Sequence, residues 1–225
     1  MATPFGRRVF LQAGAATALG IGISPASAAE TSSDQASFST VREPAREIPV
    51  VDATDVVVCG AGPAGVAAAI AAARTGASVR LIENDGQLGG IWTSGLLSWV
   101  IDAGNKGGIM EEISQRIASR VDVVGGVRWD RRGSMPYDVE QMKLVLEQMC
   151  AESGVKIRLH TRVAAAVKDG KRLTHCVAES KSGREAFAAR AFIDCTGDGD
   201  LAARAGCGFD FGGNCCEYYV HCDGV

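Results

Sequence analysis

Residues 55–85 read DVVVCGAGPAGVAAAIAAARTGASVRLIEND, and this stretch decides the fold. Its three consecutive valines are typical of a parallel strand that is buried on both faces. Gly60, Gly62 and Gly65 follow in G-x-G-x-x-G spacing. An Ala-rich segment over residues 63–75 begins with proline, which favours the first turn of a helix. The stretch therefore predicts a strand, a phosphate-binding turn and a helix.

The three glycines have separate expected roles. Gly60 permits the tight turn, Gly62 lets the backbone approach a pyrophosphate, and Gly65 lets the helix pack close to the strand. The N-terminus of the helix would offer free N–H groups and positive partial charge to the phosphates. Glu83 follows a second predicted strand, residues 78–82, where a carboxylate binds a ribose diol. The alternative interpretation is a plain Gly-rich turn before a buried helix.

A second glycine pair follows closely, in the segment DGQLGGIWTSGLLSWV of residues 85–100. We expect Gly89 and Gly90 to let this backbone lie against the same ligand. Taken alone, the pair is equally compatible with an ordinary turn.

The second half of the chain predicts a helix, a strand and a meander. Residues 137–154 have a capping box at Asp138 and Gln141 and a stop signal at Gly154. A strand over residues 155–160 comes next, and turn residues then separate three short segments, 163–168, 172–179 and 184–190, as in an antiparallel meander. The apolar positions expected to form the core of the helix are Met142, Val145, Leu146, Met149 and Cys150.

A further apolar run, residues 191–195, ends in the glycine-rich sequence TGDGD. Gly197 and Gly199 free the backbone at the carboxyl end of a strand, where ligands bind in such sheets. Asp198 is a candidate ligand-binding residue there. Asp198 and Asp200 would otherwise cap a helix that begins at Leu201.

This order of elements resembles the FAD-dependent oxidoreductases of the glutathione-reductase-like two-dinucleotide-binding superfamily. The likeness rests on the glycine motif with Glu83, on GGIWTSGL, on the helix DVEQMKLVLEQM, on IRLHTRV and on AFIDCTGDGDLAARAG. It implies an α/β fold: a Rossmann-like FAD-binding domain over residues 52–210, with a parallel sheet, helices and an antiparallel β-meander. It also implies that Val163 meets the adenine through its backbone and that Asp198 binds the ribityl chain or the flavin-side phosphate.

The candidate cofactor-binding residues combine the motif and the resemblance. They are Gly60, Gly62, Pro63, Ala64, Gly65, Glu83, Asn84, Gly89, Gly90, Val163, Thr196, Gly197 and Asp198. Residues 86–98 contain no histidine that could tether a flavin, so FAD binding should be non-covalent. No catalytic base is assigned, because His160 and His175 fall in strand patterns and His221 lies near the end of the chain.

The N-terminal residues predict an export signal. Arg7 and Arg8 precede a mild apolar run that closes with the small-residue pattern Ala26–Ala28, as in a twin-arginine signal over residues 1–28. The run is too weak for a stable membrane anchor; a membrane helix or a disordered tail is the alternative. Export across the cytoplasmic membrane would follow, and residues 29–51 read as a polar linker.

The composition argues against nucleic acids as partners and against a metal site. The net charge of −3 and the absence of a basic stripe argue against nucleic acid. Eight cysteines do not form regular metal-ligand pairs, so no metal site is expected. Cys59, Cys150, Cys176 and Cys195 are interpreted as ordinary core residues.

The expected function is the FAD-binding portion of an oxidoreductase that takes a hydride from a small organic substrate. The resemblance ends near residue 210, and residues 211–225 look like an atypical tail, truncated or frame-shifted. The substrate domain is therefore expected to be largely absent, and the exposed surface to favour self-association. Two alternatives stay open: an NAD-dependent enzyme, and a non-catalytic truncated product that binds ADP-containing dinucleotides.

Overall fold

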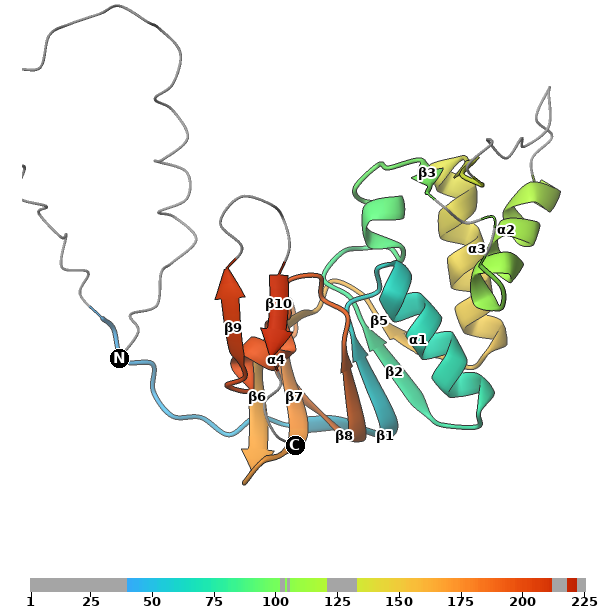
Figure 1. Ribbon diagram of the computed structural model, residues 1–225. Coiled ribbons are helices and arrows are strands. Elements are labelled where there is room, and N and C mark those ends of the chain that lie inside the picture. Colours follow the sequence, from blue (N-terminus) through green and yellow to red (C-terminus); the bar gives the residue numbers. More distant parts are fainter. Residues whose placement is uncertain (1–39, 102–103, 105, 121–132, 212–217, 222–225) are drawn as a thin grey trace, which may run out of the picture. The chain divides into compact units, whose positions relative to one another are not determined.

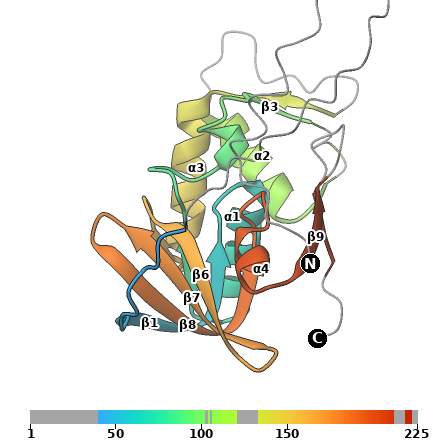
Figure 2. The same ribbon diagram turned by 90° about the vertical axis from the view of Figure 1, so that its left-hand side faces the viewer.

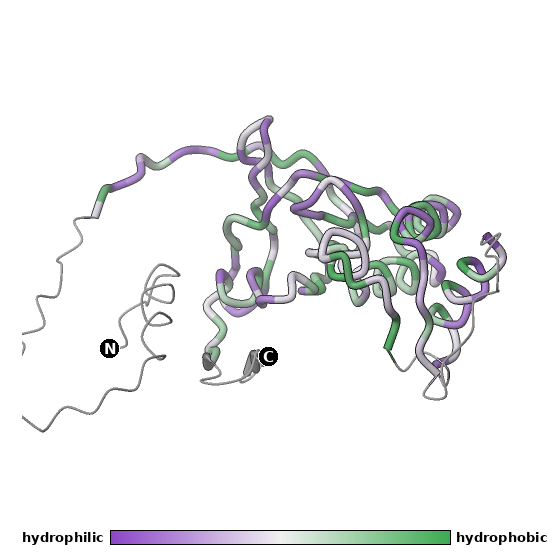
Figure 3. The backbone as a smooth tube through the Cα atoms, turned by 90° about the horizontal axis from the view of Figure 1, so that it is seen from above, coloured by the Kyte–Doolittle hydropathy of each residue, from purple (hydrophilic) through white to green (hydrophobic). Residues whose placement is uncertain are grey.

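The computed structural model describes residues 40–101, 104, 106–120, 133–211 and 218–221. The chain from Arg46 onward forms one compact unit, which contains all helices and strands of the described residues. Residues 40–45 precede this unit, belong to neither a helix nor a strand, and are mostly hydrophilic in Figure 3.

Strand β1, Val50–Cys59, is central to the fold. It pairs in parallel with β2, Val79–Ile82, on one side and with β8, Gly183–Asp194, on the other. Val57 and Val58 are both fully buried, and they belong to two different hydrophobic clusters because successive side chains point to opposite faces. The expectation of a strand that is buried on both faces is confirmed.

The main sheet, within the described residues, has six strands in the order β5-β2-β1-β8-β7-β6. Strands β5 (Lys156–Arg158), β2, β1 and β8 run parallel. Strands β6 (Arg162–Asp169) and β7 (Arg172–Ser180) continue the sheet as an antiparallel meander that leads into β8. Figure 1 shows the resulting sheet. The predicted fold class, a parallel sheet with an antiparallel meander, is confirmed.

The meander and the parallel sheet share one strand. The sequence suggested two segments, 184–190 and 191–195, but β8 runs without a break from Gly183 to Asp194. No glycine or proline interrupts residues 184–194, so nothing forces a turn there. The first half of β8 pairs with β7, while pairs with β1 extend from Ala186 to Asp194.

Three helices, α1 (Pro63–Arg74), α2 (Ile109–Arg120) and α3 (Val139–Glu152), pack around one hydrophobic core with β1 and β2. Figures 1 and 2 show them grouped together. The five expected core positions of α3 are all fully buried. The side chain of Asp138 accepts a hydrogen bond from the Gln141 amide at 2.9 Å, so the helix and its N-cap are confirmed.

Helix α2 was not predicted from the sequence. Ile113 and Ile117 are buried four residues apart on its inner face. On its outer side, Glu112 lies 2.7 Å from both Arg74 of α1 and Arg116 of α2. Arg116 also contacts Glu152 of α3 at 2.7 Å. Charged side chains therefore connect the three helices at their surface.

The remaining elements are short. A 3-10 turn, η2 (Gly90–Trp92), precedes β3 (Trp99–Val100), which pairs with β4 (Met135–Pro136). Helix α4 (Asp200–Arg204) contacts β6 and buries Leu201 in the second hydrophobic cluster. β9 (Gly208–Phe211) and β10 (Tyr218–His221) form an antiparallel pair. None of the described helices combines the length and hydrophobicity that crossing a bilayer requires.

Candidate functional site

The turn between β1 and α1 needs two of its three glycines for its own packing. Gly60 has a φ of +90°, and a Cβ there would lie 2.3 Å from the Cys195 carbonyl oxygen. A Cβ on Gly65 would lie 1.8 Å from the carbonyl oxygen of Gly60. Both distances are far below van der Waals contact, so the expected roles of Gly60 in the turn and of Gly65 in close packing agree with the geometry.

Gly62 is different, because the fold does not need it to be glycine. Its φ of −64° and ψ of −176° are accessible to any residue, and a Cβ there would meet no protein atom within 4 Å. It is the N-cap of α1, with Pro63 next to it in the first turn and no side chain capping the helix. The N–H groups of the first turn, which include Ala64 and Gly65, therefore have no side-chain cap and point out of the helix end. A Cβ at position 62 would lie in open space at this end of the helix.

Glu83 lies directly behind this turn. Its side chain is buried, with 8% of the residue exposed. One carboxylate oxygen accepts the Ala61 N–H at 2.5 Å, and the other accepts the Asp85 N–H at 2.8 Å. A carboxylate has about four acceptor positions, so Glu83 can hold the turn and still accept bonds from a ribose diol. Asn84, the next residue, is exposed.

The second glycine pair packs onto the first turn, as expected. The Gly89 amide donates to the Ala61 carbonyl oxygen at 2.7 Å. A Cβ on Gly90 would lie 3.0 Å from the Cα of Gly62. Both glycines have positive φ, +108° and +51°, so this backbone path strongly favours residues without a side chain.

Tyr137 fixes the segment that follows this pair. Its hydroxyl is within hydrogen-bonding reach of the carbonyl oxygens of Trp92 and Leu97. Burial raises the pKa of Tyr137, so the hydroxyl stays protonated and can donate a hydrogen bond to these carbonyl oxygens. The sequence analysis did not identify Tyr137, because no local pattern links it to residues 92–97.

The TGDGD loop follows β8 and adjoins the first turn. The Cys195 amide donates to the Cys59 carbonyl oxygen at 2.7 Å, which places the two strand ends side by side. Gly197 has a φ of +83° and is exposed, as is Asp198. The candidate residues Thr196, Gly197 and Asp198 therefore lie at the same edge of the sheet as Gly60.

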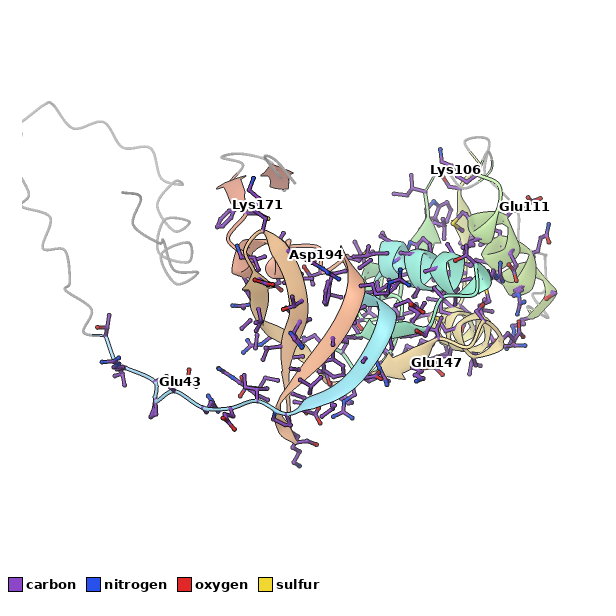
Figure 4. The ribbon with its side chains drawn as sticks, turned by 90° about the horizontal axis from the view of Figure 1, so that it is seen from below. Glu43, Lys106, Glu111, Glu147, Lys171 and Asp194 are labelled. Carbon is purple, nitrogen blue, oxygen red and sulfur yellow. The ribbon has the colours of Figure 1, made fainter. Side chains whose placement is uncertain are left out.

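A residue absent from the candidate set, Asp194, organises this loop. Its carboxylate accepts the amide of Thr196 at 3.1 Å, the Thr196 hydroxyl at 2.8 Å and the amide of Ala202 at 2.8 Å. The Thr196 hydroxyl oxygen accepts the Asp200 amide at 2.8 Å. Figure 4 labels Asp194 beside the ribbon of β8. The N-cap of α4 is Gly199 without a side-chain cap, and the amides of Asp200 and Ala202 donate to Thr196 and Asp194.

Val163 lies at the start of β6, in the strand that follows β5. Its side chain is packed in the core with only 4% exposed. The connection before it is tied to Glu83, because the Thr161 amide donates to the Glu83 carbonyl oxygen at 2.8 Å. Only the backbone of Val163 is thus available to a ligand, and its contact with adenine stays a prediction.

Two thiols near the site, those of Cys59 and Cys195, have raised pKa values. The Sγ atoms of Cys59 and Cys176 are 3.7 Å apart in the core. The hydrogen bond with Cys176 and burial raise the pKa of Cys59, and burial raises that of Cys195. Raised pKa values keep both sulfurs protonated, which disfavours nucleophilic attack. Among the described residues, no group of three or more His, Cys, Asp or Glu could hold a metal ion.

One shallow depression lies elsewhere on the surface. Its volume is about 730 Å³, and its lining includes Asp55, Thr75, Arg172 and Arg190. It contains none of the candidate cofactor-binding residues.

The candidate site is formed by backbone segments at the carboxyl ends of parallel strands, and it includes Gly60, Gly62, Glu83, Gly90 and Gly197.

A family model matches most of the chain. The model of the family described as FAD dependent oxidoreductase matches residues 55–218. The match contains every candidate residue and extends into the segment that the sequence analysis described as an atypical tail. A comparison with curated proteins found no match.

Solved structures show the same fold. THI4 of Thermovibrio ammonificans is 19% identical with a TM-score of 0.53, over 70% of this chain and 64% of that protein. A geranylgeranyl bacteriochlorophyll reductase-like protein from Thermoplasma acidophilum is 18% identical, with a TM-score of 0.52 over 69% and 42% of the two chains. The anhydrotetracycline hydroxylase OxyS of Streptomyces rimosus is 17% identical, with a TM-score of 0.54 over 70% and 35%. The chain spans less than two thirds of each.

Proposed function

We propose that this chain, which belongs to the family of FAD-dependent oxidoreductases, is the FAD-binding part of an enzyme that oxidises a small organic molecule by hydride transfer to the flavin. FAD is the cofactor of the family. The nature of the substrate and the hydride step go beyond the family assignment and are part of the proposal. The family match also favours FAD over an NAD-dependent enzyme without flavin.

The open space at Gly62 carries the proposal. Gly60 and Gly65 are glycines because the protein would otherwise clash with itself, whereas a Cβ on Gly62 would meet nothing within 4 Å. The sequence thus leaves room at a helix N-terminus that offers its N–H groups, and a pyrophosphate is the group such a site accepts. Glu83 stands at the end of the next strand, where the adenosine ribose would lie.

The described residues would hold and orient the cofactor. When bound, FAD supplies the hydride acceptor, and the protein contributes binding, orientation and electrostatics. The first turn of α1 would bind the pyrophosphate, and Glu83 the ribose diol. Gly90 and Gly197 would let backbone approach the flavin half from two sides, with Asp198 as the polar side chain. No described residue is assigned as general acid or base.

The test has two stages. Purified protein is first titrated with FAD and, separately, with NAD, and binding is measured by calorimetry. FAD binding without comparable NAD binding is expected; tight NAD binding with no FAD binding would contradict the cofactor assignment.

The second stage tests the reaction. The FAD complex is mixed without oxygen with panels of amines, alcohols and sugars, and flavin bleaching near its visible absorbance bands is followed. Bleaching by one class at a saturable rate supports hydride transfer. Binding of FAD with no bleaching by any candidate would leave the chain as a flavin-binding unit without this activity.

We also propose that residues 1–28, which lie outside the described residues, direct export by the twin-arginine route. The support is the Arg7–Arg8 pair before a mild apolar run and the pattern Ala26–Ala28. Changing both arginines to lysine should keep the precursor in the cytoplasm, measured by cell fractionation and N-terminal sequencing. Unchanged processing near Ala29 in that variant would contradict a twin-arginine signal.

A further inference from the structure

The strand order fixes where each part of the cofactor would lie, given the proposed function. Phosphates bind at the turn after β1, and the adenosine ribose binds the acid after β2, here Glu83. The next strand in the sheet is β5, which pairs in parallel with β2. Parallel strands have their carboxyl ends at the same edge, so the base attached to that ribose falls at the end of β5.

His160 occupies this place. It follows β5 by two residues, and its side chain is exposed. Its ring lies against the Gly86 backbone: a Cβ on Gly86 would come within 2.6 Å of the His160 Cε1 atom. Glycine at position 86 therefore leaves room for the imidazole beside the turn that follows Glu83.

The backbone of His160 is held in an uncommon conformation. Its φ is +50°, the left-handed region that few residues other than glycine adopt. Two hydrogen bonds hold the backbone on either side of it: the His160 amide donates to the Asp85 carbonyl oxygen at 3.0 Å, and the Thr161 amide donates to that of Glu83 at 2.8 Å. Such strained residues cluster at ligand sites, where the surrounding structure fixes them. An exposed ring on a fixed backbone, next to the carboxylate that would bind the ribose, could serve as a platform for a base.

We propose that the imidazole of His160 stacks on the adenine ring of the cofactor, with the Gly86 backbone on its other side. Every base has a π-face, and stacking on an aromatic side chain needs no further hydrogen bond. The neighbouring Val163 cannot supply a side chain, because it is packed in the core. His160 would thus determine affinity for the adenine half of the ligand.

Two substitutions distinguish the effect of the His160 ring on ligand affinity from its effect on the stability of the fold. His160→Asn removes the ring and keeps a residue that tolerates positive φ, so the melting temperature of the apo-protein should not fall. Its affinity for both FAD and ADP should fall by about 5- to 100-fold. His160→Phe keeps a ring but adds strain, so it should melt at a lower temperature and bind both ligands within about 3-fold of wild type. His175→Asn, on β7, is the matched control and should bind like wild type.

Calorimetric titration of each variant with FAD and with ADP measures these affinities. Wild-type affinity in His160→Asn would overturn the stacking role while the proposed function stands. Equal loss of affinity in His160→Asn and His160→Phe would also overturn it, since the ring would then not matter. If wild type binds neither FAD nor ADP, the proposed function fails and this inference fails with it.

Discussion

Two loops follow neighbouring strands at the same edge of the sheet, but they are stabilised differently. The turn after β1 is shaped by glycine packing, and no side chain caps the helix it leads into. The loop after β8 is held by the carboxylate of Asp194, which accepts three hydrogen bonds. One of these three donors is the Ala202 amide of α4, and the Thr196 hydroxyl oxygen accepts the Asp200 amide.

The difference indicates what each loop can offer a ligand. The turn after β1 keeps its helix amides available for an anion. In the loop after β8, two helix amides donate to protein side chains, so what this loop can offer a ligand is its exposed glycine backbone at Gly197. Under the proposed function, the turn after β1 would bind the phosphates and the loop after β8 would contact the flavin half. The predictions below test this division, from the largest expected effect to the smallest.

Gly65→Ala should have the largest effect, because the new Cβ would lie 1.8 Å from the Gly60 carbonyl oxygen. We expect the free energy of unfolding to fall by about 3 kcal/mol or more. Urea denaturation of the apo-protein measures it. A loss below about 1 kcal/mol would mean that the turn can open without cost, and that packing does not define it.

Gly62→Ala should spare the fold and damage binding. Its backbone angles suit alanine, so the free energy of unfolding should change by no more than about 1 kcal/mol. The methyl group would stand where the pyrophosphate must approach, and FAD affinity should fall about 100-fold, or about 2.7 kcal/mol. Gly107→Ala, another open position without positive φ, is the matched control. Equal FAD affinity in both variants would remove Gly62 from the site.

Asp194→Asn should affect stability and binding together. It replaces a charged acceptor by an amide that cannot satisfy all three donors, and hydrogen bonds to charged groups contribute about 1.5–3 kcal/mol each. We expect a loss of about 2 kcal/mol in unfolding free energy and weaker FAD binding. Asp169→Asn, at the exposed end of β6, should change neither. A stable Asp194→Asn with normal binding would show that the glycines alone shape this loop.

The smallest effect concerns the ion pairs away from both loops. Hydrogen bonding to Arg74 is the main cause that lowers the pKa of Glu112 below its ordinary value of 4.5. A lowered folded-state pKa stabilises the protein above the unfolded pKa, and this contribution disappears as the pH falls through the folded-state value. Glu112→Gln should cost less than about 1 kcal/mol at pH 7, and the difference from wild type should shrink in thermal melts below about pH 4.5. FAD affinity at pH 7 should not change; a large change would couple the helices to the site.

Local sequence patterns predicted much of the fold and part of the candidate site. The glycine motif located the turn, and the helical spacing of Met142 and Met149 identified a face that is fully buried. These features depend on residues close together in the chain, where steric and periodic rules apply directly. The antiparallel meander followed for the same reason, from turn residues at regular intervals.

Other features depend on contacts between distant segments. The bond from the Ala61 amide to Glu83 and the role of Asp194 arise only once strand ends meet. Helix α2 was missed although Ile113 and Ile117 have helical spacing, because mixed polar residues surround them. The continuity of β8 was obscured because one strand pairs with two partners of opposite direction, which no single periodicity reveals.

The contact between Gly60 and Cys195 also has a consequence for the order of events during protein synthesis. The glycine motif emerges early from the ribosome, yet the strand end that packs against Gly60 is made near the end of the described chain. Loop closure over such long separations slows folding. A nascent chain that contains the whole glycine motif would therefore still lack Cys195, the residue directly after β8 against which Gly60 packs. We therefore expect FAD to bind only after β8 has been translated.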